Sequence, residues 1–411
     1  MTADSHELYD ALALGAYEIL PANGLVEKLR EAARDGRPLR VKLGFDPTKP
    51  DLHIGHAVVL WALRRFQDAG HRVVLIIGDF TARIGDPTGK QEARPSLDKA
   101  EVETNAETYL AQLGRIIDLN KAEIRRNSEW LESMAMEDVI RLLGQSTVAQ
   151  MLQRENFALR HERGDAIGLH EFLYPLLQGY DSVVVNADIE LGGTDQKFNN
   201  LMGRQLQTQG GQAPQVVMLY PILEGIGTTD KMSKSLGNTI GLTDAPKTMW
   251  DKVMCISDRQ MPDYFTLASG LPAVEVKRIL HDIETGHLPP RDAKVLLAWA
   301  IVKLYHGEQN ANKLRSGTLD ASDIPAFEIA EPLPLARLLV SLKMAPSTSQ
   351  ARERLKEGAV KLLRREGDGY VLDRVLTDPH EVMSAQDEPR VIQVGKKMAL
   401  ARIIAVASPA S

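Results

Sequence analysis

Apolar and polar residues alternate along the first half of the chain in a pattern that predicts a parallel sheet covered by helices. The apolar runs 40–45 and 72–78 have the length and the β-branched content of buried strands. Between them, the segment 57–70 has apolar residues at helical spacing and ends at a glycine. A strand, a helix and a strand in so short a stretch form a βαβ unit. The sequence therefore predicts an α/β fold.

The same alternation continues to residue 223, and we expect the first domain to span 1–240. The segment 153–168 is charged and lacks clear periodicity, so we expect a mobile insertion there. Further strands are expected in 122–130, 187–193 and 214–223, and further helices in 8–34, 98–118, 134–144, 170–185 and 194–207.

The pattern changes after residue 240. The segment 241–327 is expected to form several helices with no strong strand, and 328–336, which holds two prolines, is expected to be a linker. The rest, 337–411, is expected to be a small α+β domain, with a capped helix in 347–360 and short strands in 375–379 and 390–395.

Composition places the chain among ordinary globular proteins. It has 411 residues, of which 44% are hydrophobic and 25% charged. No apolar stretch approaches the roughly 18 residues of a membrane span, and the N-terminus is acidic where a signal peptide would be basic. The single cysteine, Cys255, excludes disulfides and thiolate metal sites within the chain. We expect a soluble, cytoplasmic protein.

The net charge of −6 is unevenly distributed. Residues 335–411 hold 13 Lys and Arg against 9 Asp and Glu, so this part carries +4 and the rest carries −10. A basic end on an acidic body is compatible with local contacts to phosphates.

The loop GFDPTKPDLHIGH (44–56) joins a strand to a helix that opens with His53 and His56. Backbone N–H groups at a helix start attract anions, and Gly55 leaves room for a flat ring near the backbone. Three interpretations stay open at this point: surface histidines, an anion or nucleotide site, and an H-x-x-H metal pair that lacks an obvious third ligand. The later loop 78–90 is not a Walker A loop, because Ile84 takes the place of the required glycine.

Three more polar segments fall near strand ends or on one helix face. Tyr174, Gln178 and Asp181 share a helix face, either as an exposed polar stripe or as a site for a small zwitterion. Asp195 and Gln196 follow a strand, and KMSKS (231–235) follows another. Because ligands collect at the carboxyl ends of parallel strands, we expect these segments to form one site.

HIGH at 53–56 and KMSKS at 231–235, in that order, resemble class I aminoacyl-tRNA synthetases. Together with GFDPTKPDLHIGH, GDPTGK, YPLLQGYD and GGTDQKFN, they make the whole chain similar to bacterial-type tyrosyl-tRNA synthetases. STSQARERLKEGAVKL and the later RVIQVGKK resemble an S4-like RNA-binding domain. The resemblance implies a Rossmann-like catalytic domain, an α-helical anticodon-side domain and the S4-like domain.

The resemblance also implies an activity and its partners. The protein would activate L-tyrosine with ATP, which is bound with Mg²⁺, and then transfer tyrosine to tRNA(Tyr). No permanent cofactor and no protein-bound metal are implied. A homodimer is implied, formed through helices between about 120 and 165.

Matching positions take the family's roles. Catalytic contacts to phosphates are implied for His53, His56, Lys231 and Lys234. Further ATP contacts are implied for Asp46, Thr48, Gly55, Lys90, Arg94, Asp195 and Ser233. Tyrosine would be bound by Lys42, Gly44, Asp86, Tyr174, Gln178, Asp181 and Gln196, with Asp181 at the phenolic hydroxyl.

One position departs from the family, because Lys42 replaces a tyrosine that in many relatives meets the substrate hydroxyl. Our hypothesis is that Asp181 accepts the phenolic hydrogen and that Lys42 supports it. A Lys42 side chain that points inward could pair with Asp181 and keep it ionised, and the alternative is that it points to solvent. The competing interpretations of the chain are a tryptophanyl enzyme, a small-molecule nucleotidyltransferase, and an RNA-binding protein descended from a synthetase.

Overall fold

The computed structural model describes residues 3–48, 52–87, 98–233, 236–316, 326–329, 332–366, 369–383, 390–395 and 397–403. The chain folds into two compact units, Met1–Ala311 and Asn312–Ser411.

A six-stranded sheet in the order β1-β6-β5-β2-β3-β4 forms the centre of the first unit. Five of the strands run parallel, and β1 pairs antiparallel with β6 at one edge. This confirms the predicted α/β fold with a parallel sheet. The apolar runs form the central strands because helices cover both of their faces. The strands are β1 Glu18–Leu20, β2 Arg40–Phe45, β3 Arg72–Ile77, β4 Glu123–Arg126, β5 Ile189–Gly193 and β6 Val216–Tyr220.

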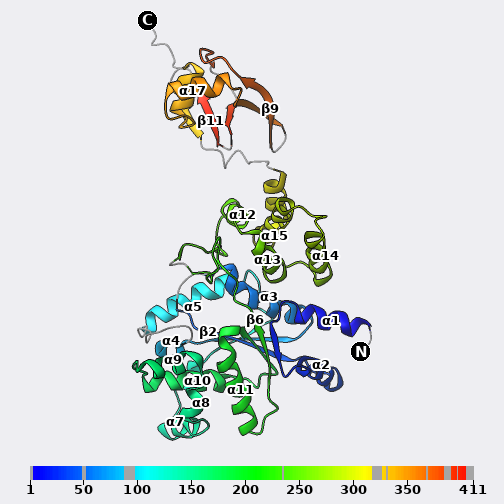
Figure 1. The fold of residues 1–411 in the computed structure, drawn as a ribbon. Coiled ribbons are helices and arrows are strands. Elements are labelled where there is room, and N and C mark those ends of the chain that lie inside the picture. The colour runs from blue at the N-terminus through cyan, green and yellow to red at the C-terminus, as the bar shows by residue number, and fades with distance from the viewer. Residues whose placement is uncertain are drawn as a thin grey trace. The chain divides into compact units, whose positions relative to one another are not determined.

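Helices pack on both faces of this sheet, with α3 on one face and α10 and α11 on the other (Figure 1). The helices are α1 Ala3–Ala13, α2 Gly24–Asp35, α3 Ile54–Asp68, α4 Thr81–Ile84, α5 Lys99–Leu113, α6 Ser128–Leu131, α7 Met136–Leu143, α8 Val148–Met151, α9 Glu155–Arg163, α10 Leu169–Val184 and α11 Lys197–Gln209. A short 3₁₀ turn, Thr194–Gln196, joins β5 to α11.

Two predictions for this unit are wrong. The segment 8–34 is not one helix, because Gly15 has a φ of 76° and the chain turns there into the edge strand β1. The segment 153–168 contains the helix α9, and one of its charged residues, Arg160, is paired inside the protein. Arg160 is 4% exposed and donates to both carboxylate oxygens of Glu171, at 2.6 and 3.0 Å.

Four more helices complete the first unit: α12 Pro246–Met254, α13 Met261–Ala268, α14 Ala273–Glu284 and α15 Pro290–Ser316, the last of which continues into the second unit. They are joined to the sheet part through side chains, because Trp61 Nε1 donates to the Tyr305 hydroxyl at 3.0 Å and the Tyr264 hydroxyl donates to the carbonyl of Glu224 at 2.8 Å. Across the described ranges, no helix is both long and apolar enough to cross a membrane.

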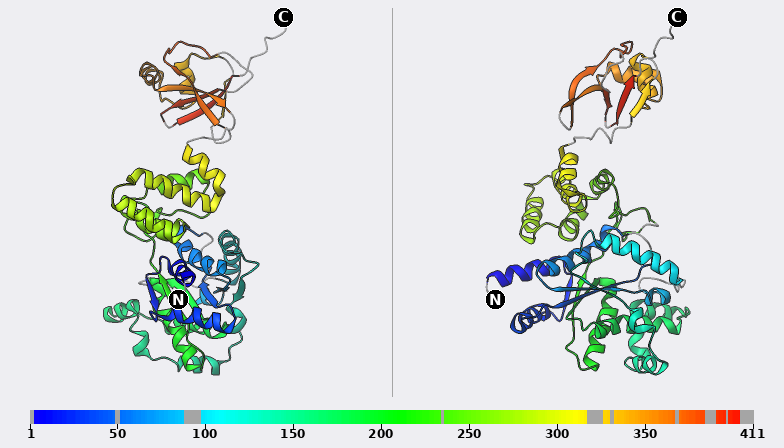
Figure 2. Two further views of the ribbon diagram at one scale, coloured as in Figure 1. Left: turned by 90° about the vertical axis from the view of Figure 1, so that its right-hand side faces the viewer. Right: turned by 180° about the vertical axis from the view of Figure 1, so that it is seen from behind.

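The second unit has its own sheet, in the order β7-β11-β10-β8-β9, and its own apolar core. Its elements are β7 Ala326–Ile329, α16 Leu335–Ser341, α17 Thr348–Lys356, β8 Val360–Glu366, β9 Gly369–Leu376, β10 Arg390–Val394 and β11 Lys397–Ile403. Figure 2 shows the two helices against one side of the sheet. The Ser347 hydroxyl caps α17 by accepting from the N–H of Gln350 at 3.3 Å. The expected linker 328–336 overlaps the end of β7 on one side and the start of α16 on the other.

Candidate active site

A cavity of about 400 Å³ lies where the strand order of the first sheet reverses. β2 has β3, the next strand in the chain, on one side and β5 on the other. The connection after β2 forms α3 on one face, and the connection after β5 forms α11 on the opposite face, so a crevice opens between their carboxyl ends. Residues from these ends, from α10 and from the segment 221–232 line the cavity.

His53 and His56 mark one end of the cavity, at the start of α3. The N–H of His53 donates to Nδ1 of His56 at 3.3 Å, and the two ring centroids are 3.9 Å apart. Gly55 keeps this turn open, because a Cβ there would lie 3.0 Å from the His53 ring. The N–H groups of Ile54 and His56 already donate to the carbonyls of Ile240 and His53, at 2.9 Å each. The positive end of the α3 dipole and the two histidine rings therefore make this end of the cavity suit an anionic group.

The segment that follows β6 packs onto the same helix start. Backbone hydrogen bonds of 2.9 and 3.1 Å join residues 52–54 to residues 240–242. Within this segment Met232 is buried, and Lys231 lines the cavity. Burial raises the pKa of Asp195 on the opposite wall, and the charge of Lys231 acts against that rise. Cationic and histidine side chains therefore gather at one end.

Asn238 fixes the course of the chain around Lys231. Its Oδ1 accepts from the N–H of Ser233 at 2.8 Å, and its Nδ2 donates to the carbonyl of Lys231 at 3.3 Å. Its own carbonyl accepts from the N–H of Ile226 at 3.0 Å. The side chain is 5% exposed, so one buried amide joins both sides of this loop.

Asp46 lies at the end of β2, between the two ends of the cavity. The hydroxyls of Tyr174 and Thr81 donate to its two carboxylate oxygens, each at 2.8 Å. Asp46 borders the cavity but is surrounded by protein, and this loss of bulk water raises its pKa to about 7.

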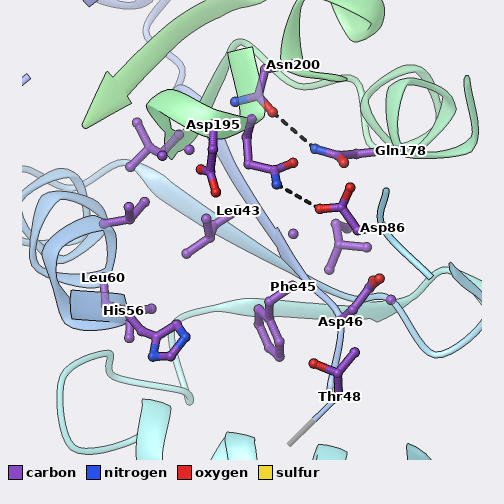
Figure 3. Close-up of a pocket in the computed structure, with 18 of the residues that line it drawn as sticks. Leu43, Phe45, Asp46, Thr48, His56, Leu60, Asp86, Gln178, Asp195 and Asn200 are labelled. Carbon is purple, nitrogen blue, oxygen red and sulfur yellow. Dashed lines mark hydrogen bonds between the residues drawn. The ribbon is translucent and has the colours of Figure 1, made fainter. Parts of the chain in front are cut away.

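Asp86 and Gln196 face each other across the cavity, where Gln196 Nε2 donates to Asp86 at 2.9 Å (Figure 3). The buried guanidinium of Arg154 donates to the other oxygen of Asp86 at 3.2 Å. A carboxylate held in this way can accept hydrogen bonds from a positively charged group in the cavity.

Gln178 and Asp181 extend the polar wall along α10. Gln178 accepts from Asn199 at 2.9 Å and donates to Asn200 at 3.1 Å. Asp181 is 3% exposed and accepts from Trp130 Nε1 at 3.0 Å and from Asn127 Nδ2 at 3.4 Å. Burial raises its pKa to about 7, against the opposing effects of Lys42 and of these two hydrogen bonds.

Lys42 points into the protein, but its direct partner is Glu190 rather than Asp181. The two charged groups are 2.8 Å apart, and Lys42 is completely buried. Glu190 lines the cavity and Lys42 does not. The direct pairing of Lys42 with Asp181 that the sequence suggested is therefore replaced by a pairing of Lys42 with Glu190. The signal for Glu190 was present as an acid inside the apolar strand 187–193, and it lies directly beside Lys42 in the β2–β5 register.

The structure brings most of the other predicted residues together around this cavity. Ser233 lies in the neighbouring loop, and Lys90, Arg94 and Lys234 lie outside the described residues. Glu190 and Asn200 line the cavity without having been predicted. The predicted residues that line it are Gly44, Asp46, Thr48, His53, Gly55, His56, Asp86, Tyr174, Gln178, Asp181, Asp195, Gln196 and Lys231.

No group of three histidine, cysteine, aspartate or glutamate side chains in the described ranges is placed to hold a metal ion. Lys231 and the positive end of α3 lie at the same end of the cavity as His53 and His56, and they favour the anion site among the interpretations open for the pair. The cavity can thus hold an anionic group at the histidine end and an ammonium group near Asp86.

Comparisons with known proteins give the chain a family. The family model for class I tRNA synthetases (W and Y) matches residues 34–320. A tyrosine--tRNA ligase of Moorella thermoacetica is 46% identical over 394 residues, which are 94% of this chain and 93% of that protein. One of Acidithiobacillus ferrooxidans is 44% identical over 406 residues, 97% of each protein.

Solved structures show the same fold. The tyrosyl-tRNA synthetase of Archaeoglobus fulgidus, complexed with L-tyrosine, superimposes with a TM-score of 0.60 at 20% identity and covers 76% of this chain and 99% of that one. A C-terminally truncated mitochondrial tyrosyl-tRNA synthetase of Aspergillus nidulans gives 0.61 at 23% identity, covering 77% and 93%.

Proposed function

The chain belongs to the class I tRNA synthetases of the tryptophan and tyrosine family, and we propose that it acts as the tyrosine enzyme. It activates L-tyrosine with ATP to give tyrosyl-adenylate and pyrophosphate, and then transfers tyrosine to the 3′ end of its tRNA. The observation that carries this proposal is a single cavity with histidines and a lysine at one end and a buried wall of Tyr174, Gln178 and Asp181 at the other. Tryptophan could also donate to Asp181, through its indole N–H, so the choice of tyrosine is supported by the relatives of 44–46% identity, which are tyrosine--tRNA ligases.

The polar wall would bind tyrosine. Its ammonium group would lie among Asp86, Tyr174 and Gln178, and its carboxylate near Gln196. The phenolic hydroxyl would donate to Asp181, with Gly44 leaving room for the ring on the sheet side. Because these side chains are already held by hydrogen bonds to protein partners, they would lose little conformational entropy when tyrosine binds.

The histidine end would bind ATP, supplied as its Mg²⁺ complex with the ion held mainly by the nucleotide and water. His53 and His56 would contact phosphates, Asp195 the ribose, and Asp46, Thr48, Gly55 and Ser233 other parts of the nucleotide. Lys90 and Arg94 would add contacts to phosphates.

The chemical step needs little covalent help from the protein. The tyrosine carboxylate attacks the α-phosphate, its bond to phosphorus forms as the bond to the leaving pyrophosphate breaks, and negative charge grows on that leaving group. Lys231, on a loop beside the helix start, and Lys234 would stabilise this charge. A loop that closes as the charge develops favours the transition state over the bound substrates.

The second unit would bind the tRNA. It is a small α+β unit with an apolar core of its own, and residues 335–411 carry a charge of +4. We infer an S4-like RNA-binding domain there, with the helices α12–α15 on the anticodon side, because basic surfaces supply much of the affinity for nucleic acids. The enzyme would act in the cytoplasm.

A homodimer would bury an apolar surface on the helices between 136 and 159. The exposed apolar residues of these helices are Met136, Ile140, Leu143, Val148 and Leu159. Substitution Ile140→Glu would place a charge among them and should convert a dimer to monomers in analytical ultracentrifugation. Monomers in the unsubstituted protein would contradict the proposal.

ATP–pyrophosphate exchange with each of the twenty amino acids tests the function directly. We expect exchange with tyrosine only, and we expect it to be lost when His56 is replaced by alanine. Exchange with tryptophan in place of tyrosine would identify the sister enzyme, and exchange without any amino acid would indicate a different nucleotidyl transfer.

A further inference from the structure

Lys42 and Glu190 form an ion pair beneath the tyrosine end of the cavity. They are direct neighbours in the register of β2 and β5, and their side chains are 0% and 2% exposed. Removing two charges from water costs stability unless every polar atom is satisfied, and replacement of such pairs by apolar residues is often neutral or stabilising. The presence of a buried ion pair here is therefore better explained by a role in the site than by a gain in stability.

The pair is saturated with hydrogen bonds that lead to α10. The Lys42 ammonium donates to Glu190 at 2.8 Å, to the Ser182 hydroxyl at 2.7 Å and to the carbonyl of Gln178 at 3.0 Å. Glu190 also accepts from Ser182 at 3.2 Å and from the amide of Gln215. The ammonium thus holds residues on both sides of Asp181, the residue next to Ser182 in the chain.

Asp181 lies under the influence of several charged and titratable groups. The charge of Lys42 favours its ionised form, and the charge of Glu190 opposes it more weakly. Asp46 and Tyr174 face the same part of the cavity, and Asn127 and Trp130 donate to Asp181 from the opposite side. Asp181 on α10 lies close to Lys42 on β2 and Glu190 on β5. The opposing charges of these two residues therefore both act on the ionisation of Asp181.

We propose that Lys42 and Glu190 are a specificity-determining pair that positions Asp181 and sets its charge, and through it the preference for a substrate with a phenolic hydroxyl. Neither side chain needs to react, so both are positioning residues. The proposal rests on the proposed function, since it concerns how the tyrosine enzyme excludes phenylalanine.

Opposite effects of the two charges provide the test. The measurement is kcat/KM for tyrosine divided by kcat/KM for phenylalanine, from pyrophosphate exchange between pH 6 and pH 9. The ratio cancels titration of groups that serve both substrates, including Asp46. Lys42→Met should move the pH at which the ratio rises by about one unit upward, a loss of about tenfold at neutral pH that recovers in alkali. Glu190→Gln should move it downward.

Ser182→Ala is the matched control, because it removes hydrogen bonds from the same network and leaves both charges in place. Its pH profile should stay where the wild-type profile lies. If Lys42→Met does not fold, the double variant Lys42→Met/Glu190→Gln leaves no lone buried charge and should show a smaller upward shift, because the lysine acts more strongly than the glutamate.

The results separate this proposal from the proposed function. A wild-type protein that does not prefer tyrosine would refute the function. A wild type that prefers tyrosine, with shifts in the same direction for Lys42→Met and Glu190→Gln, would refute only the role of the pair. The role of the pair would also be refuted if the pH profile of the ratio did not move in either variant, or if it moved as far in Ser182→Ala as in Lys42→Met.

Discussion

Replacing Asn238 by alanine should slow tyrosine activation without changing tyrosine binding. The buried amide is the link between the N–H of Ser233 and the carbonyl of Lys231, so it fixes the loop that holds Lys231. The proposed tyrosine site lies at the other end of the cavity, among Asp86, Gln178 and Asp181. The substitution therefore separates the loop from the substrate wall.

The size of the effect follows from the two hydrogen bonds that are lost. Each contributes about 0.5–1.5 kcal/mol net, so the loop geometry loses about 1–3 kcal/mol. If that geometry is needed only in the transition state, the activation rate falls by about 5- to 150-fold. The longer bond, at 3.3 Å, places the expectation toward the lower part of this range.

Single-turnover formation of tyrosyl-adenylate at saturating ATP and tyrosine measures the effect, with tyrosine affinity followed separately by equilibrium binding. Asn310→Ala is the control, because it removes an exposed amide hydrogen bond from α15, away from the cavity. A folded Asn238→Ala protein with the wild-type activation rate would show that the loop's resting geometry does not matter for catalysis. A rate loss matched by an equal loss of tyrosine affinity would point to a general disturbance of the site.

Three further outcomes are expected. Lys234→Ala should raise the activation barrier by about 2–4 kcal/mol in single-turnover kinetics with tyrosine affinity unchanged, and an unaltered rate would remove it from the charge-stabilising role. A chain ended after Ser316 should still form adenylate but charge tRNA poorly in an aminoacylation assay, and normal charging would refute the RNA-binding role of the second unit. Because the folded pKa of Asp46 is about 7 and its unfolded value is near 3.8, folding binds a proton between these values and wild-type stability falls as pH rises from about 4 to 7. Asp46→Asn lacks this contribution, so denaturant unfolding should show it gaining stability relative to wild type over that range; a constant difference would contradict the shift.

Local pattern was sufficient for the central strands and for most of the site. β3 and β6 are nearly continuous apolar runs because they are buried on both faces, and β2 and β5 are shorter apolar runs interrupted by Lys42 and Glu190; such runs are visible in the sequence. Loops that follow parallel strands meet at one edge by topology, so polar residues at 44–56 and 192–196 could be placed in one site without coordinates.

Pattern failed where partners are distant in the chain. The edge strand β1 has three residues, too few to show a period, and it exists only because β6 is there to pair with it. The charges of 153–168 suggested a mobile insertion, although Arg154 and Arg160 are buried against acids of other segments. The partner of Lys42 was missed for the same reason, since Glu190 is adjacent only across the sheet.

The two ends of the cavity differ in rigidity in a way that matches their tasks. At the tyrosine end, Asp181 and Glu190 are buried and bonded to residues of the sheet and helices, so their positions are set before substrate arrives. Such preorganisation is effective for telling one amino acid from another, because a substrate lacking the hydroxyl leaves a buried polar group unpaired. At the phosphate end, Lys231 is exposed and lies on a loop that is held by the Asn238 amide and by a few backbone hydrogen bonds to residues 223–226. A charge that can approach the leaving group as it forms lowers the barrier more than one that already binds ATP fully. Changes at the tyrosine end should therefore alter kcat/KM ratios between amino acids, whereas changes in the loop should alter the activation rate for every amino acid by the same factor.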